Sequence, residues 1–271
     1  MTPLVYAALA AVTYGASDFY GGVASRKAEA TRVVLWSQVL GLVLVSVAAP
    51  VFGGGLRLVD LGWGAAAGVA GALGLVSLYR GLATGRAAVV APMSGVLSGV
   101  VPATAGFILG ERPSVLTLGG FALAAAAVWL VSGGKLEEAA GFSLGAVAGL
   151  GFGLFFVFLA QVPETAGLWP LLPARAASVG VLLAVRRGGS APRLDRSTWG
   201  LIGAVGVGDM AANVFILLAF QQGPLGEGAV VSSLYPAVTV LLSALILREP
   251  VRRMQWTGLG LAVVAMAMIA G

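Results

Sequence analysis

The amino-acid sequence predicts an all-α polytopic membrane protein of ten transmembrane helices, arranged as two inverted five-helix repeats. Three observations lead to this prediction: an apolar composition, a succession of helix-length apolar segments, and an internal repeat. Of the 271 residues, 59% are hydrophobic and only 10% are charged, against about 45–50% and about 25% in soluble domains. The 41 glycines favour close packing of helices within lipid.

Ten apolar segments follow one another along the chain, each close to the ~20 residues that cross a bilayer as a helix. The connections between them are short, carry nearly all the charge, and contain Gly and Pro residues that interrupt helices. The segment at 168–185 is the least regular, because Pro170, Pro173 and Arg175 fall within it. The predicted transmembrane helices are 3–24, 33–52, 61–83, 87–109, 115–132, 141–160, 168–185, 198–220, 228–247 and 253–271.

The composition also excludes several classes of function. The sequence holds 0 Cys and 0 His, which excludes disulfides, Cys/His sites for zinc, haem or iron–sulfur clusters, and Ser-His-Asp or Cys-His catalysis. The Gly-rich stretch 149–153 lies inside an apolar segment, without the strand that a phosphate-binding loop requires. We therefore expect neither an enzyme nor a bound cofactor. The net charge of +5 gathers in short loops, so no nucleic-acid partner is expected.

The basic residues predict the orientation in the membrane. Thirteen of the 16 Lys and Arg residues fall in the loops after the first, third, fifth, seventh and ninth segments, whereas two fall on the opposite side and Arg175 falls within a segment. Because positively charged loops stay in the cytoplasm, we expect a multi-pass protein of the inner membrane with both termini outside. The thirteen are Arg26, Lys27, Arg32, Arg80, Arg86, Lys135, Arg186, Arg187, Arg193, Arg196, Arg248, Arg252 and Arg253, and the two are Arg57 and Arg112.

The two halves of the chain, 1–138 and 139–271, resemble one another in sequence. Four landmarks recur in the same order about 136–141 residues apart, among them a Trp-Gly pair early in the third and eighth segments. Each half holds five segments, an odd number, so the second half enters the membrane from the opposite side. Such an inverted repeat is the architecture of many secondary transporters. The recurring segments are 60–64 and 197–200, 82–85 and 220–223, 88–90 and 229–231, and 107–113 and 245–250.

The five-plus-five pattern, with a Leu-x-Glu end to the fourth and ninth segments, resembles the EamA family of the drug/metabolite transporter superfamily over essentially the whole chain. The stretch 15–22, followed by Ser25-Arg26-Lys27, is similar to a bacterial subgroup. The resemblance implies a secondary transporter that exports an amino acid, another metabolite or a drug, without an ATP site. It also implies cytoplasmic termini for many ten-span relatives, whereas the charge count of this chain places them outside.

Three ionisable side chains fall inside predicted segments, where charge is costly and points to function. Arg175 and Asp209 each lie some 10–18 Å from their segment ends at about 1.5 Å per residue, near the bilayer midplane, and Asp18 lies about two-thirds along the first segment. Arg175 suits a carboxylate or phosphate as a bidentate clamp. Asp209 or Asp18 suits an amine or a coupling proton. The alternative is that Arg175 and Asp209 only pair with each other.

Neighbouring residues extend this candidate substrate-binding site. Asn213 follows Asp209 by four residues and Tyr14 precedes Asp18 by four, so each pair shares a helix face. Gln38 is expected to face inward or to join two helices by a hydrogen bond. The remaining candidates are aromatic residues that either line a cavity or serve as packing and interface anchors: Trp36, Tyr79 and Tyr235.

Two further features have structural interpretations. Glu111 beside Arg112 and Glu249 beside Arg248 recur in the repeat, and each is expected to form an ion pair at a helix end. Pro236 removes a backbone donor within the ninth segment and is expected to kink its helix.

Together these features predict a carrier, surrounded by membrane lipid, that moves a small organic solute by alternating access. A coupling proton would have to use a carboxylate, because no His is present. One chain holds both halves, so a monomer is expected. The alternative is a lipid or lipid-linked metabolite flippase or scramblase, which Gly-rich spans open to the bilayer would suit. A scaffold without transport is disfavoured, because it gains nothing by burying charges.

Overall fold

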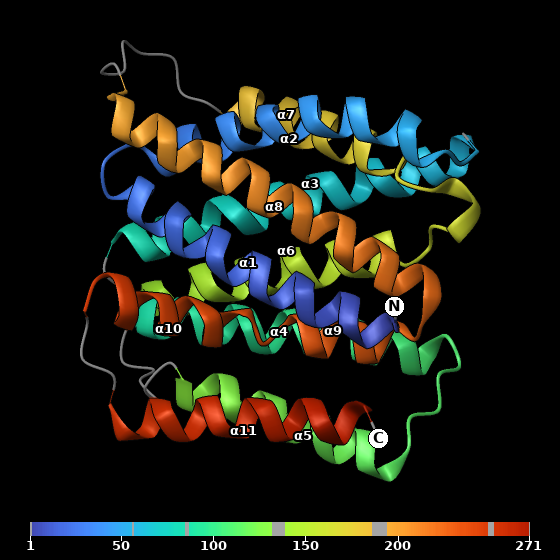
Figure 1. The fold of residues 1–271 in the computed structure, drawn as a ribbon, viewed down its shortest axis with the longest axis vertical. Coiled ribbons are helices and arrows are strands. Elements are labelled where there is room, and N and C mark those ends of the chain that lie inside the picture. The colour runs from blue at the N-terminus through green and yellow to red at the C-terminus, as the bar shows by residue number, and fades with distance from the viewer. Residues whose placement is uncertain are drawn as a thin grey trace.

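The structure, a computed structural model, describes residues 2–55, 57–84, 87–131, 139–185, 194–248 and 252–270. Within these ranges all regular secondary structure is helical, as predicted, and the helices form an elongated bundle (Figure 1). They are α1 (Pro3–Ser25), α2 (Ala30–Phe52), α3 (Leu58–Ala83), α4 (Ala87–Ile108), α5 (Val115–Val131), α6 (Ala139–Leu159), the 3-10 turn η1 (Glu164–Ala166), α7 (Leu171–Val185), α8 (Arg196–Gln222), α9 (Leu225–Ser232), α10 (Tyr235–Ile246) and α11 (Arg253–Ala270).

The helices have the length and composition of membrane spans. Five helical segments of the described chain are long and apolar enough to cross a bilayer, and four shorter apolar helices accompany them. The five are Ala30–Phe52, Leu58–Ala83, Gly141–Leu159, Arg196–Gln222 and Leu225–Ile246, and the four are Met93–Ile108, Val115–Leu130, Leu171–Val185 and Arg253–Ile269. Every predicted segment coincides with helix, and all but the ninth with a single helix.

The ninth segment consists of two helices, because proline interrupts it. α9 ends at Ser232 and α10 begins at Tyr235. Pro236 has no N–H to donate, and its ring would collide with the carbonyl oxygen of Ser232, four residues earlier. At the predicted kink the helix is interrupted by a two-residue turn, and the segment begins at Leu225 rather than at residue 228.

α7 is shorter than its predicted segment because two prolines set its start. Pro170 lies just before the helix, and Pro173 is its third residue, within the first turn, where a missing N–H costs no hydrogen bond of the helix. Arg175 therefore lies in the second turn of α7 and not near the middle of a helix, as the segment 168–185 predicts.

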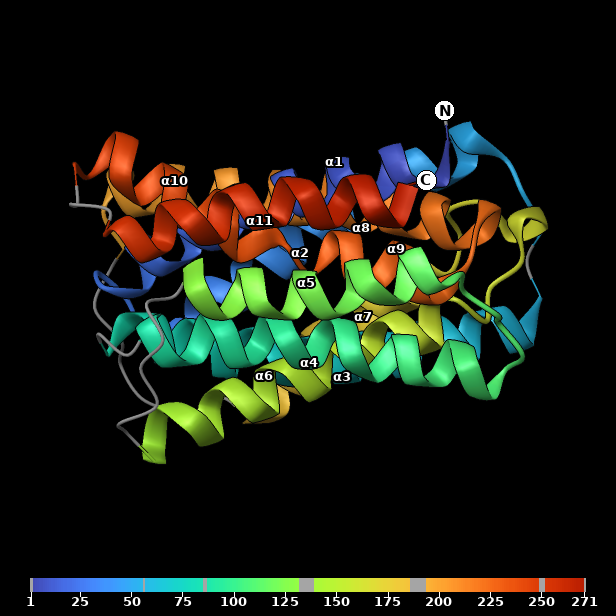
Figure 2. The same ribbon diagram turned by 90° about the horizontal axis from the view of Figure 1, so that it is seen from below.

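The two halves interleave. α1 makes its most extensive contacts with α8, α3 with α6, and α5 with α11. α6 also packs against α4, just as α1 packs against α9 and α10. The contact of α1 with α8 thus corresponds to that of α6 with α3, and the contact of α1 with α9 and α10 to that of α6 with α4, as expected for two inverted repeats. Figure 1 shows α5 and α11 together along one edge of the bundle, and Figure 2 shows both termini at the same end.

Small residues bring α1 close to two helices of the second half. Gly15 lies against the backbone of α10, and Thr239 Oγ1 donates to the Gly15 carbonyl oxygen at 3.0 Å. On the other side, Ser17 Oγ donates to the carbonyl oxygen of Val205 in α8, also at 3.0 Å. These contacts fix which face of α1 points into the bundle. The glycines of 149–153 pack α6 against α3 and α4 in the same manner, so their role is close packing.

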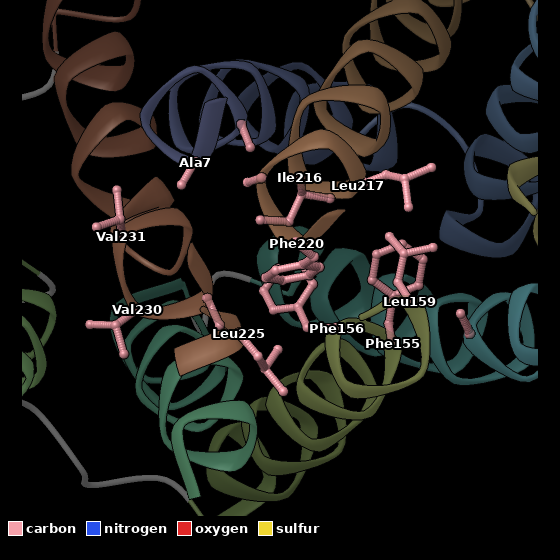
Figure 3. Close-up of a cluster of buried hydrophobic side chains, with 14 of the residues drawn as sticks. Ala7, Phe155, Phe156, Leu159, Ile216, Leu217, Phe220, Leu225, Val230 and Val231 are labelled. Carbon is pink, nitrogen blue, oxygen red and sulfur yellow. The ribbon is translucent and has the colours of Figure 1, made fainter. Parts of the chain in front are cut away.

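Two apolar clusters fill the two ends of the bundle interior. The first lies mainly toward the end that carries both termini and reaches Ala127 and Val128 near the other end of α5. Figure 3 shows aromatic and aliphatic side chains of this cluster converging from α1, α6, α8 and α9. Its labelled members include Ala7, Phe155, Phe156, Leu159, Ile216, Leu217, Phe220 and Leu225. The second cluster joins the ends of α1, α3 and α7 to the beginnings of α2, α4 and α8 at the opposite end.

Candidate functional site

A cavity lies at mid-depth between the two apolar clusters. Both halves of the chain line it, through α1, α2 and α3 of the first and α6, α7, α8 and α10 of the second. The polar lining residues are Tyr14, Asp18, Gln38, Arg175, Ser178, Asp209, Asn213 and Tyr235. The other lining residues are small or apolar, namely Gly68, Gly71, Ala72, Leu75, Phe152, Phe155, Phe156 and Ala174.

Arg175, Asp209 and Gln38 form a closed hydrogen-bonded set in this cavity. Asp209 is the middle residue of the 27-residue α8, and its Oδ2 accepts from Arg175 Nη1 at 2.6 Å and from Gln38 Nε2 at 3.0 Å. Gln38 Oε1 in turn accepts from the same Arg175 nitrogen at 2.5 Å. The three residues are only 4–5% exposed. The two charges that the sequence places near the midplane are therefore paired with each other.

Main-chain and amide groups complete this set. Asn213 Nδ2 donates to the carbonyl oxygen of Asp209 at 2.6 Å and lies 3.4 Å from its Oδ1. Arg175 Nη2 reaches the same carbonyl oxygen at 3.4 Å. Both N–H groups of Nη1 have partners within the protein. The set is therefore electrically neutral, and Arg175 does not present its two terminal nitrogens as an open fork.

Asp18 has no cationic partner among the described residues, in contrast to Asp209. Its side chain lines the cavity and is 5% exposed. Tyr79 of α3 lies next to the Asp18 carboxyl group and packs its ring against Gly21 of α1. The Tyr79 hydroxyl is buried and meets hydrogen-bond geometry with no group of the described chain. The Asp18 carboxyl group therefore has the Tyr79 hydroxyl beside it but no cation among the described residues.

Tyr14 Oη and Ser178 Oγ are also buried hydroxyl groups without a partner in the described chain. Both residues line the cavity. Buried polar groups without a hydrogen bond are uncommon, and ordered water or a bound ligand usually satisfies them. Tyr235 differs, because its Oη forms a 2.7 Å hydrogen bond with Ser94 Oγ. The cavity therefore offers hydroxyl groups to a polar occupant.

An aromatic face of α6 forms the apolar side of the cavity. Phe152, Phe155 and Phe156 follow one another at helical spacing and lie on one face. The ring of Tyr14 lies 6.3 Å from that of Phe156 between centroids, and the ring of Tyr235 lies 6.5 Å from that of Phe152. This side suits the apolar part of an organic molecule.

Seven of the nine predicted site residues line the cavity, namely Tyr14, Asp18, Gln38, Arg175, Asp209, Asn213 and Tyr235. Trp36 does not. It is 40% exposed and packs edge-to-face against Trp199, with ring centroids 5.3 Å apart. Trp36 is two residues from Gln38, about 200° around the helix, so the two side chains point to different sides. Tyr79 lies beside Asp18 and not in the lining.

Ser178 and the three phenylalanines of α6 also line the cavity, although the sequence does not predict them as site residues. Ser178 follows Arg175 by three residues, a spacing that places both on one helix face. The phenylalanines have the same kind of spacing, which signals a shared face but not what that face contacts. The described residues contain no group of three or more His, Cys, Asp or Glu that could hold a metal ion.

Glu111 binds the start of α9 and not its neighbour Arg112. Its carboxylate accepts from the N–H groups of Leu225 at 2.5 Å and Gly226 at 3.0 Å, where the positive end of the helix dipole favours an anion. The predicted ion pair is therefore wrong, because Arg112 is exposed and donates to main-chain carbonyl oxygens. Glu249, the counterpart of Glu111 in the repeat, lies outside the described residues.

Comparisons with known proteins agree with this architecture. The model of the EamA-like transporter family matches residues 1–133 and, a second time, residues 139–271. One protein of known crystal structure superposes with a TM-score of 0.72 over 97% of this chain and 98% of its own, at 15% sequence identity, and so shares the fold. None of the curated proteins matches the sequence. Because the family model covers both halves, this chain belongs to the EamA-like transporter family.

Proposed function

We propose that this membrane transporter moves a small organic solute, such as an amino acid, another metabolite or a drug, out across the inner membrane by alternating access. The observation that carries the proposal is the cavity at mid-depth, which both halves line with buried polar groups. An inverted repeat places two related gates around one such site. The apolar clusters on either side of the cavity are the natural positions of these gates.

The Arg175–Asp209 pair belongs to the transport site in this proposal. Stability alone gives little reason to keep it, because apolar residues of similar volume in place of a buried ion pair are often neutral or stabilising. The pair joins α7 to α8, and Gln38 joins both to α2. A solute that competes for any of these hydrogen bonds would loosen the contact among three helices, and this links occupancy to helix movement.

Each repeat, 1–138 and 139–271, forms one half of the carrier, and a monomer completes the pathway. The basic loops face the cytoplasm and both termini face outward in this proposal. Because the chain has no Cys, single introduced cysteines report on the orientation. One in the loop 186–197 should be labelled only from the cytoplasmic side, and one after Gly271 only from outside. Labelling in the reverse sense would overturn the orientation without affecting the proposed transport site.

Transport by purified protein in liposomes tests the function. We expect uptake or efflux of at least one solute from a panel of radiolabelled amino acids and amines. The double variant Arg175→Met/Asp209→Leu should melt at or above the wild-type temperature, because it retains volume and loses two buried charges, yet transport at background level. The matched control is Arg57→Met/Asp60→Leu, which removes an ion pair at the start of α3, remote from the cavity, and should transport normally.

Two outcomes would contradict the proposal. Normal transport by Arg175→Met/Asp209→Leu would exclude the pair from the transport site. Movement of a fluorescent lipid across the liposome membrane, with no transport of any solute, would favour the flippase or scramblase class instead.

A further inference from the structure

The cavity carries an unbalanced charge, and from this we propose a substrate class and a coupling site. We infer that Asp18 is the group for which a singly charged organic cation and a proton compete. The substrate would be an amine or ammonium compound with an apolar, ring-bearing body. The inference rests on the proposed function and adds the charge of the solute and the residue that binds it.

The first argument is the charge balance of the lining. Arg175 contributes one positive charge, whereas Asp209 and Asp18 contribute one negative charge each, so the ionised cavity has a net charge of −1. Arg175 and Asp209 neutralise each other at 2.6 Å. A buried charge without a partner is strongly unfavourable, so the Asp18 carboxylate requires either a proton or a cation from the solute. A zwitterion or an anion would leave the net negative charge unbalanced.

The second argument is that Arg175, the one cation among the described lining residues, already has partners within the protein. Arg175 uses both N–H groups of Nη1 on Asp209 and Gln38, and directs Nη2 at the Asp209 carbonyl oxygen. Its Nε faces α2 at Gly41. A bidentate grip on a substrate carboxylate needs two parallel free N–H groups, and the arrangement of these atoms opposes one. The expectation that Arg175 clamps an acidic group therefore has less support than a cation at Asp18.

The third argument is the aromatic surface. Tyr14, Phe152, Phe156 and Tyr235 line the same cavity as Asp18. Aromatic faces attract organic cations by about 0.5–2 kcal/mol each when solvent is excluded, and they bind an apolar body equally well. A compact carboxylate beside several rings is a combination that suits an ammonium group and disfavours a sugar or a phosphate.

The surroundings of Asp18 fit an exchange of proton for cation. The titratable or charged groups that face it are Asp209 on α8, Tyr235 on α10 and Tyr79 on α3, with Tyr14 one turn earlier on α1. None of these is a cation that would hold Asp18 permanently ionised. The Tyr79 hydroxyl lies next to Asp18 and can donate to a carboxylate or accept from a carboxylic acid, so it can interact with Asp18 in both states.

Calorimetry on the full-length protein in detergent tests the inference with three ring-bearing probes of different charge. They are benzyltrimethylammonium (a permanent cation), phenylalanine (a zwitterion) and 3-phenylpropionate (an anion). We expect the cation to bind most tightly, with a Kd that rises by up to about tenfold per pH unit at low pH as protons occupy Asp18. Buffers of different ionisation enthalpy should reveal release of up to one proton per bound cation.

Three variants identify the residue. Asp18→Asn should weaken cation binding at least tenfold and abolish both its pH dependence and the proton release. It should melt at or above the wild-type temperature, because it removes an unpaired buried charge. Asp18→Glu should keep the proton release. The matched control Asp60→Asn removes another buried carboxylate, outside the cavity, and should bind like the wild type.

Two results would overturn the inference. The first is tighter binding of phenylalanine than of the cation, unchanged in Asp18→Asn. That result would leave the cavity as a solute site and so preserve the proposed function. The second is failure of all three probes to bind, after which the proposed function is decided separately by the transport panel and by Arg175→Met/Asp209→Leu.

Discussion

Replacing Asp209 by asparagine leaves the Arg175 guanidinium buried without a counter-charge. The two side chains are each 6% exposed, with Nη1 and Oδ2 2.6 Å apart. At an effective dielectric constant of about 20, the gross attraction at that distance is about 6 kcal/mol. Measured losses on removal of one partner of a buried pair are smaller, about 3–5 kcal/mol, because the partner relaxes. We expect Asp209→Asn to lower the free energy of unfolding by this smaller amount.

Reversible unfolding in sodium dodecyl sulfate, followed by tryptophan fluorescence, measures this change, since the chain contains 6 Trp. Asp18→Asn is the control, because it makes the same chemical change in the same cavity at a carboxylate without a cationic partner. We expect it to leave the free energy of unfolding unchanged or to raise it. Arg175→Met/Asp209→Leu should recover all of the stability that Asp209→Asn loses, because no buried charge is left without a partner.

Equal losses in Asp209→Asn and Asp18→Asn would refute this reasoning. They would mean that the cavity responds to any polar change and that the pairing of Arg175 has no special weight. A loss below about 1 kcal/mol in Asp209→Asn would also refute it, since such a value is typical of exposed ion pairs.

Three further predictions concern the scaffold around the cavity. Glu111→Gln should lower the free energy of unfolding by about 1.5–3 kcal/mol, because two hydrogen bonds to a charged group at the start of α9 are weakened, whereas Arg112→Gln should be nearly neutral by the same measurement. Gly68→Ala should cost about 1–3 kcal/mol by forcing α3 away from the backbone of α7, while Gly62→Ala on the same helix, where a Cβ meets nothing, should be neutral or slightly stabilising. Asp195 caps α8, and its hydrogen bonds to Thr198 hold its pKa below the ordinary 3.8. Asp195→Ala should therefore lower the melting temperature at pH 7. The difference between the variant and the wild type should fade as the pH falls through that lowered pKa, because the wild-type carboxylate is then protonated and loses its advantage as a cap.

The architecture is accessible from the sequence because lipid enforces it. An apolar segment of membrane length has to be helical to satisfy its backbone, so segment lengths and the recurring landmarks define ten spans in two inverted halves. The interruption at Pro236 is only partly predictable from the sequence. Proline predicts a kink, but whether the helix bends or divides into α9 and α10 depends on how these helices pack. The start of α7 also cannot be predicted from the sequence alone. Pro173 is tolerated in the first turn of a helix but not in its interior, and only packing determines where the first turn lies.

For the candidate site, the sequence predicts which residues share a helix face but not which side chains pair with one another. Charges inside apolar segments point directly to Asp18, Arg175 and Asp209. The sequence of α2 does not predict which of its faces points inward, because the segment is apolar on all sides. Trp36 and Gln38 are therefore both candidates, although only Gln38 lines the cavity. Contacts between distant parts of the chain, such as the cap that Glu111 provides 114 residues away, leave no local signal at all.

The interleaved pairing of the two halves has a consequence for biogenesis. α1 packs chiefly against α8, yet 170 residues of chain separate the end of one at Ser25 from the start of the other at Arg196. At roughly 5–20 residues per second, α1 waits roughly 9–34 s in the membrane before its partner is made. During that interval the face of α1 that carries Ser17, which contacts Val205 of α8, has no partner helix. A helix with a polar face toward an absent neighbour is a natural client for a membrane chaperone.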